Sequence, residues 1–384
     1  MKIHKLLLGA AICFSLTSCF KDEPLNAECD VEQAYVHVDD PTSVFFSVSD
    51  TLVNVRSDAT EIVFEIKADT LEDFEMAPMF RLTEGAVIEP ANGSKHDFSG
   101  GKSVAYKVTS QDGKWSKTYN VSFRTPDTPD EYHFEDYRLV SGPNKGQIYE
   151  WSDLTADGSW IGDWATGNPG FNISMGDAKL EDYPTVPVSD GYVGNGVKLT
   201  TRDTGPLGHL VGMNIAAGNL FIGYFDVSQA LTNTLNATNF GRSFDKVPLG
   251  LTGWYKYRPG AVFTDKNGKK VEGRTDTGDI YAVIYRNHDE NGNSIMLHGD
   301  DVLSSPYIVA VARVPELSVT DEWTQFDVKF DYKAEIDSKT LAERGYNLSV
   351  VFTSSIEGAT FEGAIGSTLY VDEVKVICSN TTTE

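Results

Sequence analysis

The sequence is poor in cysteine, with four in 384 residues. Cys13 and Cys19 lie close to the start of the chain, while Cys29 and Cys378 stand far apart in the remainder. None of these spacings matches a zinc knuckle or a Cys-x-x-Cys redox pair. A disulfide between Cys29 and Cys378 stays an open alternative, because an export compartment permits one and nothing in the sequence demands it.

Basic residues are also scarce. The chain has 32 Lys and Arg residues against 56 Asp and Glu, which gives a formal net charge of −24. A chain this acidic repels phosphate backbones, so we expect no nucleic acid partner. The same repulsion disfavours an anionic polysaccharide, unless a local basic cluster overrides the overall field.

The common catalytic signatures are missing. The sequence contains no Gly-x-Ser-x-Gly, no His-Glu-x-x-His and no glycine-rich phosphate loop. His288 and His298 do not have the spacing of a recognised metal site. We therefore expect no metal or cofactor, with a structural calcium ion held by backbone and carboxylate oxygens as an open alternative, although no EF-hand loop is present.

A long apolar run occurs only at the start, from Leu6 to Leu16, after Lys2 and Lys5. It is too short for a stable membrane span and has the layout of a secretory signal peptide. The following Leu-Thr-Ser-Cys19 resembles the lipobox of bacterial lipoproteins, in which the cysteine is diacylated and becomes the mature N-terminus. Residues 1–18 are thus predicted to be a lipoprotein signal peptide. A plain signal peptide with a chance cysteine is the alternative.

Beyond Cys19 comes a short charged segment that we expect to act as an acidic tether over residues 19–30. Its first residues, Phe-Lys-Asp-Glu at 20–23, resemble the surface-export signal of Bacteroidetes lipoproteins. This resemblance implies a protein held to the outer membrane by acyl chains and exposed at the cell surface. An ordinary tether with no export role is the alternative.

Residues 31–124 are rich in short strand-like runs, such as VFFSV at 44–48 and TYNVSF at 118–123. Asp112-Gly113 marks a hairpin turn. This pattern predicts an immunoglobulin-like β-sandwich. The runs GAVIEP and YKVTSQDG resemble the small β-domains of Bacteroidetes surface lipoproteins, where the domain is mostly a spacer or a platform.

A linker over residues 125–131, with two prolines and three acids, separates this segment from a larger one at 132–379. The larger segment is again strand-like with few helices, and its length suits a two-sheet jelly roll. Residues 380–384 are a short tail. The predicted fold class is therefore all-β, with an immunoglobulin-like sandwich followed by a larger jelly-roll sandwich.

The larger segment contains four distinctive runs, which are WATGN at 164–168, AGNLFIGYF at 217–225, FGRSF at 240–244 and LTGWYKYRPG at 251–260. These runs resemble the putative carbohydrate metabolism domain of Bacteroidetes lipoproteins. The resemblance covers residues 132–378 and implies a jelly-roll fold with a carbohydrate-related role. The family is sometimes labelled a glycoside hydrolase, without an agreed catalytic site.

Two of these regions carry the side chains that proteins use to hold sugars. Flat aromatic rings pack against sugar C–H groups, while amides, carboxylates and guanidinium groups bind the hydroxyls. The predicted glycan-binding residues are Trp160, Asp163, Trp164, Asn168, Trp254, Tyr257 and Arg258. For Trp254, which lies in a strand-like run, a place in the core is the favoured alternative.

Hydrolysis of a glycoside would need two carboxyl groups facing each other across the bond, about 5 to 5.5 Å apart for retention or about 6.5 to 9.5 Å for inversion. The candidates are Asp163 with Glu181 or Asp182, because these acids flank the loop at residues 159–171, which carries Trp160 and Trp164. The presence of acids decides nothing in a chain with 56 of them. We therefore expect a glycan-binding protein that does not cleave its ligand, with a glycoside hydrolase and a structural or adhesin-like surface subunit as alternatives.

Overall fold

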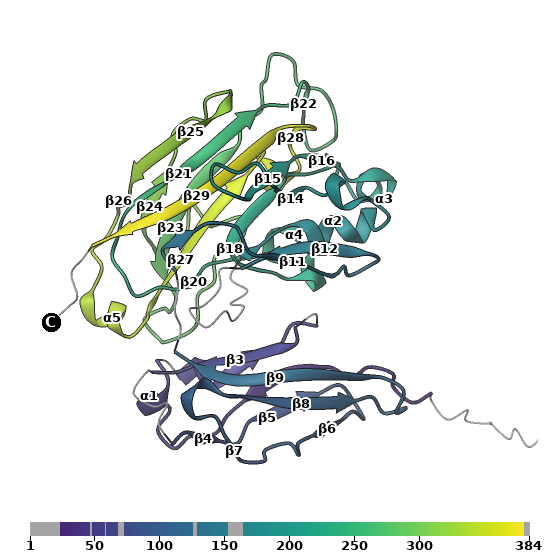
Figure 1. Cartoon of the computed structure of the whole chain (residues 1–384), viewed down its shortest axis with the longest axis vertical. Coiled ribbons are helices and arrows are strands. Elements are labelled where there is room, and N and C mark those ends of the chain that lie inside the picture. Colours follow the sequence, from purple (N-terminus) through teal and green to yellow (C-terminus); the bar gives the residue numbers. More distant parts are fainter. Residues whose placement is uncertain are drawn as a thin grey trace, which may run out of the picture.

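The computed structural model describes residues 24–46, 48–57, 59–67, 73–125, 129–152 and 164–379. It has two bodies, a smaller one from the N-terminal part of the chain and a larger one from the rest (Figure 1). Among the described residues, no helix has the length and apolar character needed to cross a membrane. The predicted signal peptide, Cys19, Trp160 and Asp163 lie outside the described residues.

The smaller body is a β-sandwich with a three-stranded sheet ordered β2-β1-β5, a four-stranded sheet ordered β3-β9-β8-β6 and a β4-β7 pair. Its strands are β1 (Val31–Tyr35), β2 (Leu52–Asn54), β3 (Glu61–Glu65), β4 (Glu75–Met76), β5 (Met79–Leu82), β6 (Val87–Glu89), β7 (His96–Asp97), β8 (Ser103–Thr109) and β9 (Ser116–Arg124). Short helical turns are α1 (Pro41–Val44), η1 (Val48–Thr51) and η3 (Ser99–Gly101). The strands enclose an aromatic core in which the Phe64 and Phe123 rings stack with centroids 4.8 Å apart.

The larger body has two main sheets. The first is ordered β13-β18-β27-β23-β24-β26, with β19 beside β18 and β20 beside β27. Its strands are β13 (Trp164–Ala165), β18 (Asn219–Phe225), β19 (Thr238–Phe240), β20 (Arg242–Ser243), β23 (Asp279–Arg286), β24 (Ile308–Arg313), β26 (Asp331–Tyr332) and β27 (Tyr346–Thr353). We call it the inner sheet, because its central strands β23 and β27 are almost wholly buried.

The second main sheet, the outer sheet, is ordered β14-β15-β29-β21-β25, with β10 on β29. Its strands are β10 (Glu131–Tyr132), β14 (Thr185–Val188), β15 (Gly196–Thr200), β21 (Pro248–Arg258), β25 (Thr320–Lys329) and β29 (Thr368–Cys378). The remaining elements are β11 (Tyr137–Ser141), β12 (Gln147–Trp151), β16 (Arg202–Asp203), β17 (Ile215–Ala216), β22 (Phe263–Thr264), β28 (Gly363–Ala364), α2 (Asn168–Met175), α3 (Gly205–Leu210), α4 (Thr234–Ala237), α5 (Ser338–Ala342), η4 (Leu180–Asp182), η5 (Val227–Gln229) and η6 (Gly358–Thr360). The predicted all-β fold is confirmed.

The outer sheet has one buried face and one exposed face, and β21 shows why. Leu251, Tyr255 and Tyr257 point into the core, whereas Thr252, Trp254 and Lys256 are only partly covered. Successive side chains of a strand point to opposite faces, so this alternation fixes the register. The inner sheet is covered on both faces, because a second cluster of hydrophobic residues packs on its far side. Of the faces of the two main sheets, the exposed face of the outer sheet is therefore the one that a ligand can reach.

Cys29 and Cys378 do not form a disulfide bond in the structure, because both are free cysteines. Cys29 packs against the core of the smaller body and Cys378 against that of the larger one. Burial raises the pKa of the Cys378 thiol to about 12. A thiol that holds its proton this firmly is a poor nucleophile at neutral pH, so Cys378 has a packing role.

Candidate functional site

A row of alternating lysines and aromatic rings crosses the exposed face of the outer sheet. Lys198 on β15 lies opposite Tyr370 on β29, which in turn lies opposite Lys256 on β21. The Lys256 Nζ atom is 5.6 Å from the centre of the Tyr370 ring and 4.5 Å from that of Trp323 on β25. The Lys198 Nζ atom, from the strand on the other side of β29, is 5.9 Å from the centre of the Tyr370 ring. We call these four residues the lysine row.

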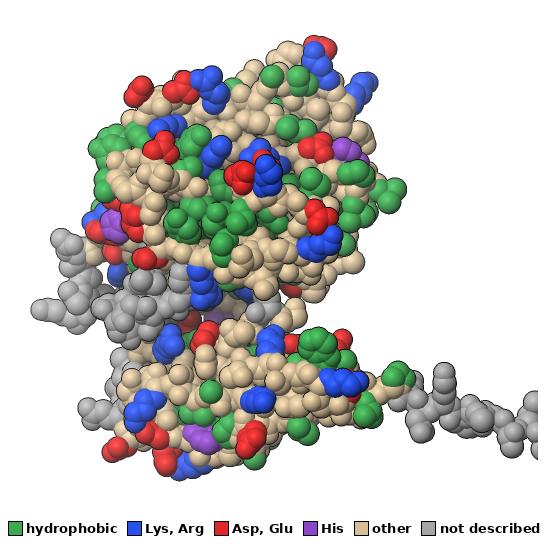
Figure 2. Space-filling view, turned by 45° about the vertical axis from the view of Figure 1, so that its right-hand side comes forward, with side chains coloured by type: hydrophobic (Ala, Val, Ile, Leu, Met, Phe, Trp, Pro, Cys, Tyr) green, Lys and Arg blue, Asp and Glu red, His purple; other side chains and the backbone are tan. Residues whose placement is uncertain are grey.

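Three aromatic rings lie together at one end of this row, and Trp323 belongs to both groups. Tyr192, on the loop between β14 and β15, stacks on Trp254 with ring centroids 3.9 Å apart and an angle of 10° between the planes. Trp323 meets Tyr192 edge-on at 6.4 Å. We call these rings the aromatic platform. Tyr192 is 44% exposed, and Figure 2 shows that hydrophobic side chains gather in patches on the surface of the larger body.

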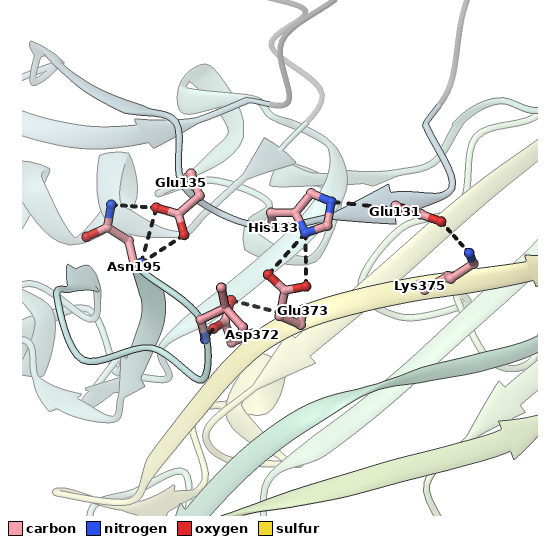
Figure 3. Close-up of polar contacts among 8 residues, drawn as sticks. Glu131, His133, Glu135, Asn195, Asp372, Glu373 and Lys375 are labelled. Atoms are coloured by element: carbon pink, nitrogen blue, oxygen red, sulfur yellow. Dashed lines mark hydrogen bonds and ion pairs between the residues drawn. The ribbon is translucent and has the colours of Figure 1, made fainter.

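The loop that carries Tyr192 is held from below by two carboxylates (Figure 3). The backbone N–H of Val193 donates to Asp372 Oδ2 at 2.9 Å, and the backbone N–H of Asn195 donates to Glu135 at 3.0 Å. Gly191 is required here, because a Cβ atom at this position would lie 2.6 Å from the Asn195 backbone and 2.7 Å from Asp372 Oδ2. These contacts preorganise the loop with its ring against Trp254.

A charged cluster lies beside the platform, which we call the His133 cluster. His133 Nδ1 is 3.0 Å from a Glu373 carboxylate oxygen, and its Nε2 is 4.0 Å from Glu131, which also pairs with Lys375 (Figure 3). The cluster lines an open hollow of about 300 Å³ on the side that faces the platform. The rest of the lining includes Tyr192, Thr252, Trp254 and Gln325. The hollow thus combines aromatic faces with hydrogen-bonding groups of both signs.

Asp372 differs from the carboxylates of the His133 cluster, because its side chain has no exposed surface. Burial raises the pKa of its carboxyl group to about 6, although backbone N–H groups that donate to it act in the opposite direction. Asp372 therefore acts as a positioning residue beneath the loop. Among the described residues, no three His, Cys, Asp or Glu side chains lie together as metal ligands would.

This raised pKa predicts how Asp372→Asn changes the dependence of stability on pH. The folded state holds the proton up to about pH 6, whereas an unfolded aspartate loses it near 3.8. The contribution of Asp372 to stability is thus present at low pH and declines as the pH rises from about 4 to about 6. We expect the wild-type free energy of unfolding, relative to the variant, to fall by about 1–3 kcal/mol across this window. Urea unfolding at several pH values measures it.

The matched control for this experiment is Asp327→Asn, which removes an exposed carboxylate from β25 of the same sheet. A difference between wild type and Asp372→Asn that is flat from pH 4 to 7 would contradict the raised pKa.

The structure corrects the predicted role of Trp164, which is only 4% exposed. Its ring lies in the core against Tyr132, Phe134 and Phe352, with centroids 5.1, 5.2 and 6.1 Å away. The glycine-rich segment that follows it leads into α2, but the ring itself points between the two main sheets. It cannot offer a face to a sugar, so the prediction that Trp164 is a stacking residue is wrong.

Asn168 and Tyr257 are corrected for the same reason. Asn168 is fully buried, where its side chain donates to the Thr185 carbonyl at 2.8 Å and accepts from the Thr185 N–H at 3.1 Å. Tyr257 is 1% exposed, and its hydroxyl group donates to the Ser354 carbonyl at 3.3 Å. Both side chains serve the fold and are not available to a ligand.

The remaining predicted residues divide between the site and the rest of the surface. Trp254 is partly exposed and is not among the buried residues of the core, so the structure does not support its place as a core anchor, and its glycan-binding role stays a prediction. Arg258 is exposed at the end of β21, where its Nε donates to Asp321 at 3.1 Å. Glu181 and Asp182 are exposed on η4 and do not line the hollow. Because Asp163 lies outside the described residues, its predicted pairing with either acid stays a prediction.

Sequence reasoning missed most of the residues that form the site. They are His133, Tyr192, Lys198, Lys256, Trp323 and Tyr370. The alternation within β21 could have placed Trp254 and Lys256 together on the face opposite Tyr255 and Tyr257. No local signal could have placed Tyr192 on Trp254, because the loop and the strand are distant in sequence.

Two family models match this chain, and one of them is carbohydrate-related. Residues 133–377 match the family model described as putative carbohydrate metabolism domain, and residues 43–122 match the one described as SGBP, N-terminal. The comparison with curated proteins found no match.

Two solved structures are similar over long stretches. A protein of Bacteroides thetaiotaomicron described as a putative glycoside hydrolase is 37% identical, with 94% of this chain and 100% of that chain covered and a TM-score of 0.80. A protein of Bacteroides vulgatus with the same description is 38% identical, with 65% and 98% covered and a TM-score of 0.61. The chain belongs to the putative carbohydrate metabolism domain family.

Proposed function

We propose that this protein is a surface lipoprotein that binds a glycan on the aromatic platform and does not cleave it. The observation that carries the proposal is the stack of Tyr192 on Trp254 at the exposed face of the outer sheet. The exposed face of Tyr192 is apolar surface in contact with water, and a sugar ring that stacks on it would bury that surface. Because the loop is already held in place, binding would cost little ordering of the protein. Tyr192 is the most exposed of the three platform rings and is the surface on which a sugar would stack.

The hollow beside the platform supplies the polar part of recognition. Thr252 and Gln325 offer a hydroxyl and an amide, and His133 lies at the border of the hollow. Such groups can donate to and accept from sugar hydroxyls, while the rings contact the C–H face. The exposure of Tyr192 also speaks against the structural-subunit alternative, in which all the aromatic rings would lie in cores.

The test is a titration of the purified chain without residues 1–19 against a broad glycan panel. Tryptophan fluorescence reports binding, because Trp254 and Trp323 both belong to the platform, and a reducing-end assay of the same wells reports cleavage. We expect a fluorescence change with at least one glycan and no new reducing ends. If no glycan of the panel changes the fluorescence or yields new reducing ends, the proposal is wrong.

Hydrolysis is the second candidate function, because Glu131 and Glu373 flank His133 and line the hollow. The descriptions of both similar structures also name this activity. Against it, Glu131 is paired with Lys375, and Glu373 with His133. Asp372 has the raised pKa of a general acid but no exposed surface. New reducing ends that disappear in both Glu131→Gln and Glu373→Gln would establish the hydrolase.

The membrane anchor is proposed on the lipobox-like sequence at Cys19 and on the match of residues 43–122 to the SGBP N-terminal family. We expect Cys19→Ala to abolish incorporation of labelled palmitate and to release the protein from the outer-membrane fraction, because two or more acyl chains are needed for stable anchoring. Cys29→Ala is the control and should label normally. Labelling that survives Cys19→Ala would refute the assignment.

A further inference from the structure

We propose that the glycan bound at the platform carries anionic substituents and that Lys198 and Lys256 receive them. This inference rests on the proposed function, and it adds the chemical class of the ligand. It starts from the lysine row, whose two ammonium groups lie on the exposed face of the outer sheet beside the platform.

The two ammonium groups are positioned by aromatic rings. The Lys256 Nζ atom lies between Trp323 and Tyr370, at 4.5 and 5.6 Å from the ring centres, and Lys198 approaches Tyr370 at 5.9 Å. Cation–π contacts of this kind hold a cation in place but leave its N–H donors without an acceptor. Both lysines are partly exposed, so these donors face solvent or a ligand.

Neither lysine has a carboxylate partner within the part of the chain that the structure describes. Two other basic groups of this sheet do pair with acids, since Arg258 pairs with Asp321 and Lys375 with Glu131. What sets Lys198 and Lys256 apart is that both lie against the same Tyr370 ring, so two positive charges are neighbours in a chain of net charge −24. An anion on the ligand would supply the missing partner.

Two acids, Asp190 and Asp321, lie near enough to Tyr370 for their charges to affect it, although neither forms an ion pair with Lys198 or Lys256. Burial raises the pKa of the Tyr370 hydroxyl, and the charges of Asp190 and Asp321 add to that effect. Because Arg258 neutralises Asp321, the three basic groups outnumber the two acidic ones around Tyr370. The lysine row is thus a local basic cluster of the kind that overrides an acidic overall field at short range, since salt screens distant charges beyond about 8 Å.

The anion can be a carboxylate of a uronic acid or a sulfate ester. An ammonium group is a compact point charge that accepts either geometry, unlike the planar guanidinium group, which selects for bidentate carboxylates. The platform would stack one sugar ring while the row binds the anionic group of that sugar or the next. The shared chemistry is an anionic glycan, and the experiment separates its two sources.

The test compares matched polymers by affinity electrophoresis and calorimetry. The probes are polygalacturonate with its carboxyl-reduced form, and κ-carrageenan with its desulfated form. We expect the mature chain to bind at least one anionic polymer about tenfold more tightly than its neutral partner, which is the size expected for a charge-assisted hydrogen bond. The preference should weaken as NaCl rises from 50 to 500 mM, because salt screens the attraction between the ammonium groups and the anion.

Substitutions then connect the preference to the row. Lys198→Gln and Lys256→Gln should each reduce binding of the anionic polymer, and the double variant should remove the preference, while Lys198→Arg and Lys256→Arg retain it. Thermal unfolding confirms that each variant is folded. Equal affinity for charged and neutral forms, or a preference that survives the double substitution, overturns the inference and leaves glycan binding intact. Absence of binding to any glycan overturns the proposed function as well.

Discussion

Replacing Tyr192 and Trp254 together by alanine should weaken glycan binding by about 30-fold or more. The two rings stack at 3.9 Å and line the hollow, so the double substitution removes both the stacking surface and its support. Truncation of a central aromatic residue in a binding site costs about 2 kcal/mol or more, which corresponds to this loss of affinity. Isothermal titration against the glycan found in the panel measures it.

Trp115→Ala is the matched control for this experiment. Trp115 is 62% exposed in the turn between β8 and β9 of the smaller body, and it takes no part in the platform. Its removal should leave affinity unchanged, because an exposed ring outside the site contributes only nonspecific contacts. Equal retention of glycan by wild type and by the Tyr192, Trp254 double variant would place the binding surface elsewhere.

Two single variants separate the contribution of the Tyr192 ring to glycan affinity from that of the loop that holds it. Tyr192→Ala removes the most exposed ring but leaves the hollow lined by Trp254. Gly191→Ala keeps both rings, yet its Cβ atom would clash with the Asn195 backbone and with Asp372. If the preorganised loop matters, Gly191→Ala weakens binding although no ligand-facing atom has been changed.

The fold could be predicted from the sequence because strand patterning is local. The alternation in β21 and the run of apolar residues in β23 both report burial directly, so the all-β class follows from short windows. The family resemblance was predicted from four such windows, among them the one that holds Trp254. None of these windows contains information about which rings end on the same face of different strands.

The site depends on contacts between distant parts of the chain, which is why most of it was missed. The loop that places Tyr192 on Trp254 is held by Asp372, near the far end of the sequence, and by Glu135. Trp164 shows the converse error. A tryptophan in a glycine-rich segment suggested an exposed loop, but β13 pairs with β18 and directs the ring inward. Burial of a single aromatic residue is a tertiary property that local composition does not report.

Trp164→Ala should therefore destabilise the protein and leave the chemistry of the site untouched. The ring is 4% exposed and packs against Tyr132, Phe134 and Phe352 in the core. Truncation of a buried tryptophan to alanine costs about 3–5 kcal/mol, because the cavity does not refill. We expect a clear fall in the denaturation midpoint, measured by circular dichroism in urea, with Trp115→Ala within about 0.5 kcal/mol of wild type.

The same variant separates the core role of Trp164 from the binding role that its sequence context suggests. If Trp164 were a stacking residue, alanine would abolish glycan binding with little effect on stability. If it is a core residue, the fraction of protein that remains folded binds with unchanged affinity, and Trp164→Phe recovers most of the lost stability by refilling the space between the rings of Phe134 and Phe352. The two outcomes differ in both measurements, so one protein preparation assigns Trp164 either to the core or to the ligand.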